Sequence, residues 1–333
     1  MGKLRNPELK KLLSCIRKDP QVIVPPMAGY DAGVHLIGDK YLVVSTDPCI
    51  GVPEKWFGWL LVNYAASDVA LSGAKPEFCA INLLAPLATK LSAFQRIMKQ
   101  VCIAADELNM VIVRGHTGTY AGILETIGVC TAYGTVVKER LLTSGNAKAG
   151  DLIMCTKTIG LETLINFSLT HQKTAKTIFG TQEAEQLKRL VKMESCAKEA
   201  SALAEIPGVH ALHDATEGGL TNALNEVAEA SQLGFKIDFE ALPITPEMRA
   251  LQDKFNLSMQ QLLSTSSTGT IVAAIEKQAQ PAVEEALNRH RVPFTFIGTL
   301  TKDNDRVLEW KSGSTPFPNV AEDPYGMILS GKV

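Results

Sequence analysis

Hairpins and helical crossovers both occur in this chain, and the mixture restricts its fold class. The β-rich stretches at 34–37 and 41–45 are separated by a Gly-Asp turn, which predicts a hairpin. Later β-rich stretches are separated by long helical patterns, which we expect at 56–72, 181–204, 218–232 and 277–290. Two domains of α/β class, α+β in type, fit this pattern better than one doubly wound sheet.

A turn-rich stretch near 145–150 divides the two halves. The length of 333 residues suits two domains of ordinary size. The Gly-Asp turn at Gly150–Asp151 opens a new strand, so we predict domains at 1–148 and 149–333. No glycine-rich nucleotide fingerprint of the Rossmann or P-loop kind accompanies either half.

Composition excludes several classes of function. The net charge of −2 leaves no basic face for nucleic acid, and the apolar stretches are shorter than the roughly 20 residues of a membrane span. The N-terminus is charged and resembles no secretory signal, so we expect a cytoplasmic protein. The seven cysteines include no C-x-x-C pair and predict buried free thiols, with Cys15 and Cys102 among them.

Acidic residues recur where β-rich stretches end. "YLVVSTD" ends in Asp47 and "VHALHD" ends in Asp214, while "MVIVRGHT" predicts a strand and then a loop with His116 in the acid's place. Asp31 lies in a glycine-bounded loop, and Asp68 lies on an otherwise apolar helix. A single Asp after a strand is most often a turn or cap residue, so Asp214 or Thr216 could simply cap the helix that follows.

Several carboxylates at one sheet rim would indicate a different role. Converging carboxylates repel one another unless a cation holds them. Mg²⁺ prefers oxygen ligands and usually bridges one or two carboxylates to phosphates. Glycines beside the acids, including Gly115, Gly218 and Gly219, would let backbone N–H groups approach a phosphate. The residues therefore leave two interpretations open: ordinary turn chemistry, or a nucleotide–metal site.

The same stretches, in order, resemble the PurM-like superfamily, which is related to AIR synthetase. The similarity is in "GYDAGVHLIGDKYLVVSTDPCIG", "NYAASDVALSGAKPEF", "VRGHTGTY", "GDLIMCTKTIG", "HDATEGGLTNALNEVA" and "STSSTGTIVAAI", and the correspondence extends from about residue 20 to about residue 300. The resemblance implies an N-terminal domain whose sheet pairs with that of a second subunit in a homodimer, and a C-terminal α+β domain.

The resemblance also implies ATP and Mg²⁺ as cofactors. Carried over motif by motif, the metal ligands are Asp31, Asp47, Asp68 and Asp214. The residues near ATP are Thr46, Gly115, Thr117, Thr216, Gly218 and Gly219, with Lys3 as a further phosphate contact. His116 and Asp214 are the implied catalytic residues, and His116 could equally serve only to hydrogen-bond a loop. Glu217 stays open between a partner of the helix dipole and a substrate contact.

Within the superfamily the motifs are most similar to the HypE-like branch, which implies activation of an amide or carboxyl oxygen by phosphoryl transfer and a maturation partner protein. HypE carries its substrate group on a C-terminal Cys, whereas no Cys follows Cys196 here. Two alternatives stay open: a small-molecule kinase like thiamine-monophosphate kinase, and a non-catalytic nucleotide-binding scaffold.

Overall fold

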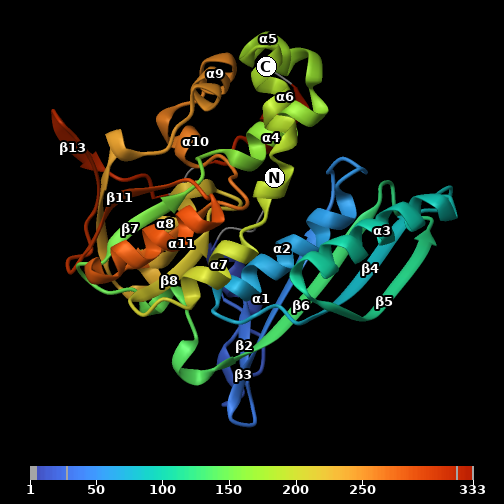
Figure 1. The fold of residues 1–333 in the computed structure, drawn as a ribbon, viewed down its shortest axis with the longest axis horizontal. Helices are drawn as coiled ribbons and strands as arrows, with labels where there is room; N and C mark the ends of the chain where they lie inside the picture. Colours follow the sequence, from blue (N-terminus) through green and yellow to red (C-terminus); the bar gives the residue numbers. More distant parts are fainter. Residues whose placement is uncertain (1–5, 28, 320–321, 332–333) are drawn as a thin grey trace. The chain divides into compact units, whose positions relative to one another are not determined.

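The computed structural model describes residues 6–27, 29–319 and 322–331, and these form two compact units (Figure 1). The N-terminal unit comprises Arg17–Pro26 and Asp31–Leu141. The C-terminal unit comprises Leu142–Val333 together with Met1–Ile16 and Met27–Tyr30. Lys3 lies outside the described residues.

A six-stranded mixed sheet forms the N-terminal unit, in the order β1-β2-β3-β6-β4-β5. β4 and β5 are parallel and the other neighbours are antiparallel. The elements are β1 (Val22–Val24), β2 (Gly33–Ile37), β3 (Lys40–Cys49), α2 (Phe57–Leu71), β4 (Phe78–Pro86), α3 (Leu91–Leu108), β5 (Val111–Tyr120), β6 (Ile127–Val137) and the 3₁₀ turn η1 (Lys138–Arg140).

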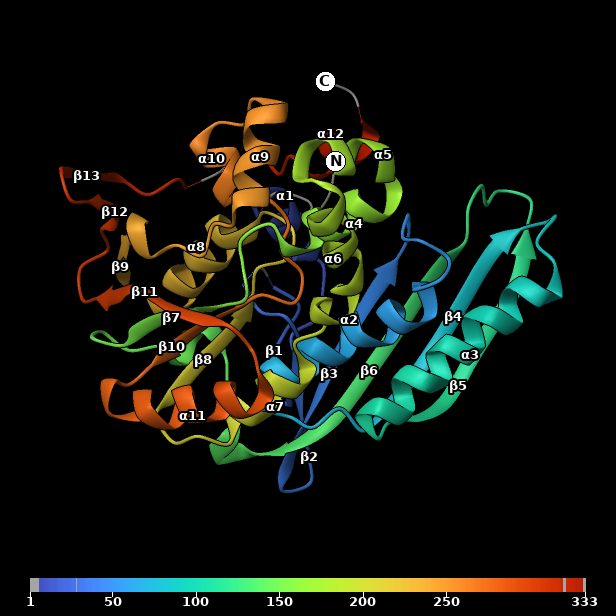
Figure 2. The same cartoon turned by 45° about the horizontal axis from the view of Figure 1, so that its top comes forward.

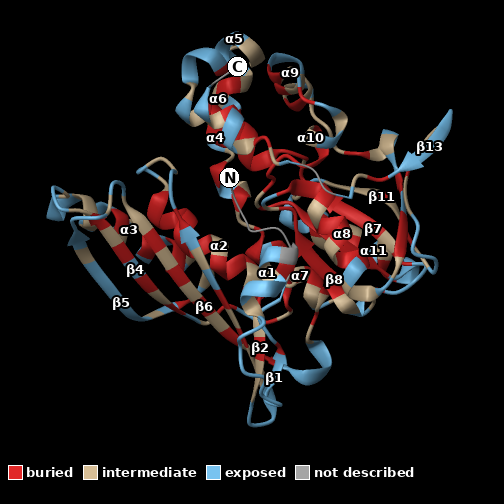
Figure 3. Ribbon diagram, turned by 180° about the vertical axis from the view of Figure 1, so that it is seen from behind, coloured by how far each residue is buried: buried red, intermediate tan, exposed pale blue. Residues whose placement is uncertain are grey.

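Helices α2 and α3 lie along one face of this sheet (Figure 1). α2 is apolar around most of its circumference and almost wholly buried. It approaches α3 closely because Gly58 has no side chain: a Cβ there would lie 2.3 Å from the carbonyl oxygen of Ile97. At the sheet edge β5 is exposed along nearly its whole length (Figure 3).

A seven-stranded mixed sheet forms the centre of the C-terminal unit, in the order β13-β12-β9-β11-β7-β10-β8. Its strands are β7 (Leu152–Thr156), β8 (Val209–Asp214), β9 (Gly234–Asp238), β10 (Ile271–Ile275), β11 (Phe294–Thr301), β12 (Arg306–Trp310) and β13 (Gly313–Pro316). β9 and β12 are parallel, and the remaining neighbours are antiparallel.

The helices of this unit are α1 (Asn6–Leu13), α4 (Leu161–Thr170), α5 (Gln172–Phe179), α6 (Thr181–Arg189), α7 (Ala197–Ala204), α8 (Gly219–Ser231), α9 (Pro246–Phe255), α10 (Met259–Leu263), α11 (Gln280–His290) and α12 (Tyr325–Ser330). Short 3₁₀ turns are η2 (Ser144–Asn146), η3 (Val191–Glu194), η4 (Phe239–Ala241) and η5 (Lys277–Ala279).

α8 and α11 lie on opposite sides of the C-terminal sheet (Figure 2). The apolar face of α8 is buried: Leu220, Leu224 and Val227 join the main core with strand residues such as Ile153 and Phe235. A second core gathers around Phe167 of α4, with Met248, Leu251 and Phe255 of α9.

Most predicted elements are confirmed, but the long helix expected at 181–204 is wrong. It is broken into α6, η3 and α7. The buried Lys157 ammonium donates to the carbonyls of Met193 and Ser195 at 2.8 and 2.9 Å. A distant side chain thereby takes two carbonyls that a continuous helix would have used for its own ladder.

Two smaller predictions are also wrong. Cys15 lies beyond the end of α1 and is exposed, and Cys102 is exposed on the outer side of the amphipathic α3.

Among the described residues, no helix is both long and apolar enough to cross a bilayer.

Candidate functional site

Two of the predicted acids meet at one serine in the N-terminal unit. The Ser45 hydroxyl lies 2.8 Å from Asp47 Oδ2 and 2.8 Å from Asp68 Oδ2. β3 supplies Ser45 and Asp47 on the same face, two residues apart, and α2 supplies Asp68 from above that face. The two carboxylate oxygens are therefore at most 5.6 Å apart, twice 2.8 Å.

This arrangement suits a hard cation. A hydroxyl has one proton, so Ser45 cannot donate fully to both carboxylates at once. Ser45 is buried, while Asp47 and Asp68 are only half-buried and stay within reach of an ion. Two carboxylates and a hydroxyl are the oxygen ligands that Mg²⁺ prefers. The residues present thus fit the metal that the family resemblance implies.

The sequence predicted that Asp47 ends its strand, and this prediction is wrong. β3 continues to Cys49, and Asp47 pairs with Cys130 of β6. Thr46 faces the opposite side of the sheet from Asp47, because successive side chains alternate. Its hydroxyl lies 2.9 Å from that of Thr131. Asp31 is half-buried in the turn just before β2.

The loop predicted around His116 is wrong, because Gly115, His116 and Thr117 lie inside strand β5. β5 is parallel to β4, and a Cβ at Gly115 would lie 2.7 Å from the carbonyl oxygen of Ile81. Gly115 therefore permits close strand pairing, and the hydrogen-bond ladder extends the strand to Tyr120.

His116 is also distant from Asp47 within one chain. β6 and β4 separate β3 from β5, so roughly 14 Å of sheet lies between the two residues. His116 pairs with Asn82, whose side chain is on the exposed face, and the His116 ring hydrogen-bonds the Tyr120 hydroxyl. The structure does not bring His116 to the acid pair of its own unit.

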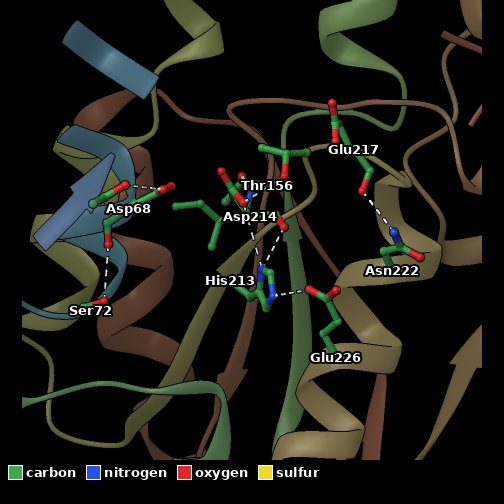
Figure 4. A network of polar contacts seen from close by, with 11 residues as sticks. Asp68, Ser72, Thr156, His213, Asp214, Glu217, Asn222 and Glu226 are labelled. Atoms are coloured by element: carbon green, nitrogen blue, oxygen red, sulfur yellow. Dashed lines mark hydrogen bonds and ion pairs between the residues drawn. The ribbon is translucent and has the colours of Figure 1, made fainter. Parts of the chain in front are cut away.

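In the C-terminal unit, Asp214 ends β8 as predicted and is buried. The Thr216 hydroxyl lies 3.5 Å from Asp214 Oδ1. The neighbouring His213 points to α8, where its Nε2 lies 2.9 Å from Glu226 Oε2 (Figure 4). The other ring nitrogen lies 2.9 Å from the Asp214 carbonyl, which can only accept, so Nδ1 carries a proton. Glu226 thereby anchors the end of β8 to α8.

The two glycines after Asp214 serve the local packing. Gly218 and Gly219 have φ of +82° and +55°, which favour glycine. A Cβ on Gly219 would lie 2.5 Å from the Thr265 carbonyl oxygen. The Gly218 N–H donates to Asp323 and the Gly219 N–H donates to Thr216, so both groups have acceptors in the chain.

Neither Asp214 nor Thr216 caps α8, contrary to one interpretation of the sequence. The N-cap is Gly218, and no N-cap side chain accepts a hydrogen bond there. The acid at this helix start is instead Asp323, which is 105 residues away and accepts from Gly218, Ser266 and Tyr325 backbone N–H groups. Glu217 is exposed, and its carbonyl accepts from Asn222.

Two carboxyl groups of the C-terminal unit have a pKa above its ordinary value. Burial raises the pKa of Glu162, although the Ser266 and Thr268 hydroxyls that donate to it lower the pKa in part. Burial likewise raises the pKa of Asp323, against the lowering effect of its three backbone donors.

Sequence reasoning missed Ser45, Glu226, Asp323 and Glu162. Ser45 carries a usable signal, because it lies two residues before Asp47 on a strand and so shares its face. Glu226 lies seven residues after Gly219 on α8 and appears as an ordinary solvent-facing acid. Asp323 and Glu162 become neighbours of the Ser266 loop only in the folded chain.

Comparison with known proteins places both halves in one family. Residues 29–136 match the N-terminal domain of AIR synthase related proteins, and residues 148–311 match the C-terminal domain. A hydrogenase expression/formation protein of Methanocaldococcus jannaschii is 27% identical, covering 84% of this chain and 81% of its own. The carbamoyl dehydratase HypE of Cupriavidus necator is 27% identical, covering 82% and 80%.

Solved structures share the two-domain fold. A hydrogenase maturation protein HypE in complex with ATP superposes with a TM-score of 0.71 at 21% identity, covering 96% of this chain and 92% of that one. A HypE–HypF complex gives 0.71 at 19% identity, covering 87% and 93%. A ThiL protein complexed with AMPPCP and TMP gives 0.69 at 19% identity, covering 92% and 95%.

The predicted two-domain PurM-like fold and the resemblance to HypE proteins are therefore confirmed. The motifs that suggested them lie inside the two matched regions. The chain belongs to the AIR synthase related family, with both its N-terminal and its C-terminal domain.

Proposed function

We propose that this chain is an ATP- and Mg²⁺-dependent HypE-like enzyme that activates an amide or carboxyl oxygen by phosphoryl transfer, in the maturation of a hydrogenase or another metallocentre. Relatives named carbamoyl dehydratase HypE support the reaction class, and a HypE of the same fold has been solved with ATP. A HypE–HypF complex supports a maturation partner protein. We expect the protein to work in the cytoplasm, away from membrane and nucleic acid.

The observation that carries this proposal is the meeting of Asp47 and Asp68 at the Ser45 hydroxyl. Under the proposal Asp31, Asp47, Asp68 and Asp214 hold Mg²⁺, and the ion supplies charge neutralisation for the transferred phosphoryl group. Asp47 and Asp68 contribute oxygen ligands, and buried Ser45 keeps the two carboxylates near each other. The assignment of Thr46, Gly115, Thr117, Thr216, Gly218 and Gly219 to ATP binding stays a prediction.

We also propose a homodimer formed through the N-terminal sheet. β5 is an edge strand of that sheet and is exposed, with Val111 and Val113 showing 56% and 47% of their surface. An exposed apolar edge of this length invites pairing with a second strand. In such a dimer His116 belongs to the interface, where it would serve a second copy's acids rather than those of its own unit.

Calorimetric titration of ATP, with and without Mg²⁺, tests the proposal. We expect Mg²⁺-dependent binding in the wild type and at least a tenfold weaker Kd in the double variant Asp47→Asn/Asp214→Asn, about 1.4 kcal/mol or more. Asp39→Asn is the matched control, because Asp39 is an exposed acid in the β2–β3 turn. Binding without Mg²⁺ dependence in the wild type, or full affinity in the double variant, would rule the proposal out.

Product analysis separates the proposed reaction from a kinase reaction. The ThiL structure with AMPPCP and TMP has the same fold and favours the kinase as the second candidate. A phosphorylated small molecule as final product indicates a kinase, whereas ADP, free phosphate and a dehydrated product indicate HypE-like chemistry. ATP turnover at background level with every candidate acceptor and partner present would indicate a nucleotide-binding scaffold.

A further inference from the structure

A second polar cluster lies in the C-terminal unit, around His210 near the start of β8, whereas Asp214 ends that strand. His210 Nδ1 lies 3.0 and 2.9 Å from the two carboxylate oxygens of Asp151. His210 Nε2 lies 3.0 Å from the Lys148 ammonium nitrogen. The three side chains thus form a continuous Asp–His–Lys chain of hydrogen bonds.

Sheet register explains why these residues meet. β10 lies between β7 and β8 and pairs with both. Its Ile275 pairs with Leu152 of β7 and with Val209 of β8, so the two strands begin at the same end of the sheet. Asp151 immediately precedes Leu152 and His210 immediately follows Val209. The His210 side chain reaches across the intervening strand to Asp151. No sequence motif indicates this contact.

The contacts determine where the ring protons lie. Asp151 Oδ2 also accepts from the Lys148 backbone N–H at 2.8 Å, as an ionised carboxylate would. An ionised carboxylate only accepts, so His210 Nδ1 must donate to it. The neutral ring then has its lone pair on Nε2, directed at the Lys148 ammonium group. This tautomer makes His210 the proton acceptor for the lysine.

Burial decreases from Asp151 through His210 to Lys148, as expected for a chain that ends in a reactive amine. The Asp151 side chain is 4% exposed and the His210 side chain 15% exposed. Lys148 is exposed, so a small molecule can reach its amine from solvent. A buried acid that orients an imidazole toward a nucleophile is the arrangement that activates the nucleophile in hydrolase triads.

We propose that Lys148 is an activated amine that accepts an acyl group from a small acyl phosphate. The ammonium group gives one proton to His210 Nε2, and the freed nitrogen lone pair attacks the carbonyl carbon. The new N–C bond forms as the C–O bond to phosphate breaks, and phosphate leaves with that electron pair. The second nitrogen proton leaves with the phosphate, and His210 returns its proton to water. Lys148 thereby becomes a neutral amide.

A purely structural role for Asp151 would not require the contacts that His210 makes. Asp151 closes the 148–151 turn through the Lys148 N–H, and its own N–H donates to the Lys148 carbonyl at 3.1 Å. That turn requires neither the imidazole nor its contact with the ammonium group. A structural role therefore predicts ordinary reactivity at Lys148, whereas the relay predicts enhanced reactivity.

Acylation of the intact protein by acetyl phosphate distinguishes the two. Peptide mass spectrometry would follow acetylation of each lysine over time, with no ATP added, so the result does not depend on the proposed function. We expect Lys148 to react at least about tenfold faster than Lys236, an exposed lysine 3.6 Å from Glu309, since general base catalysis contributes about 10²–10⁴-fold. His210→Gln should reduce Lys148 to the rate of Lys236, and the control His290→Gln, in exposed sequence at the end of α11, should not.

Equal rates at Lys148 and Lys236 in the wild type would overturn the proposal, as would an unchanged Lys148 rate in folded His210→Gln. If that variant does not fold, ¹⁵N NMR of the wild-type ring decides instead. The proposal requires a proton on Nδ1 and a lone pair on Nε2, and the opposite tautomer would overturn it.

Discussion

The acids of the N-terminal unit and those of the C-terminal unit are held by different kinds of partner. Asp47 and Asp68 share one serine hydroxyl, which has a single proton to offer. In the C-terminal unit Glu226 faces the His213 ring, and Asp323 accepts from three backbone N–H groups. In the N-terminal unit one hydroxyl proton is divided between two carboxylates, whereas in the C-terminal unit three backbone donors serve Asp323.

This difference separates ligand binding from structural support. Carboxylates that share a donor repel each other, and a cation relieves that repulsion. A carboxylate that pairs with a buried group supports that group, and its removal leaves the group without its partner. We therefore expect removal of Glu226 to lower stability and removal of Asp68 to raise it, while the predictions at Gly219 and Glu162 concern the C-terminal unit alone.

The largest expected effect is at Glu226. Glu226→Ala leaves buried His213 facing an empty position, and breaking a buried pair from one side costs about 3 kcal/mol of unfolding free energy. Glu229→Ala is the matched control on the same helix, because its pair with Lys10 is exposed and contributes less than about 1 kcal/mol. Chemical denaturation measures both, and similar losses would show that Glu226 is not an anchor.

A smaller loss is expected at the glycine turn. Gly219→Ala combines a φ of +55° with a Cβ 2.5 Å from the Thr265 carbonyl oxygen, for about 2–3 kcal/mol. Gly51→Ala, in the N-terminal unit, has a φ of +70° in open space and should lose only about 1 kcal/mol. Thermal unfolding compares the two variants. If the losses match, the contact with Thr265 contributes nothing.

Substitution of Asp68 should change the unfolding free energy in the opposite direction. Asp68→Asn removes one of the two charges that share Ser45, so we expect it to stabilise the Mg²⁺-free protein by about 1 kcal/mol. Added Mg²⁺ should raise the Tm of the wild type more than that of the variant, since a ligand stabilises the state that binds it. Destabilisation of the Mg²⁺-free variant would contradict the idea that the two carboxylates repel.

The smallest effect is a pH dependence at Glu162. Burial raises its pKa in the folded state, so the folded chain binds more protons than the unfolded chain between the two pKa values. The contribution of Glu162 to stability is fully present below the ordinary glutamate pKa and is lost as pH rises through the folded pKa. Glu162→Gln should flatten this decline in the unfolding free energy, measured by denaturation from pH 4 upward. Parallel curves of unfolding free energy against pH for wild type and variant would contradict this role of Glu162.

Local patterns predicted the elements well where neighbouring residues decide the outcome. The hairpin of β2 and β3 and the helices α2 and α8 follow from alternation, helical period and turn residues. The predictions that proved wrong involve distant groups. Lys157 interrupts the helix expected at 181–204, and pairing with β4 turns the loop expected around His116 into a strand.

The sequence by itself determined the fold class, the family and the set of acids, because short-range periodicity and motif order are properties of the linear chain. Only the tertiary structure decided which donors each acid receives. It placed Ser45 between Asp47 and Asp68. It directed the Gly218 N–H to Asp323, and it joined Lys148 to Asp151 through His210. These contacts join residues up to 105 positions apart, and such pairings arise only when the strands and helices pack.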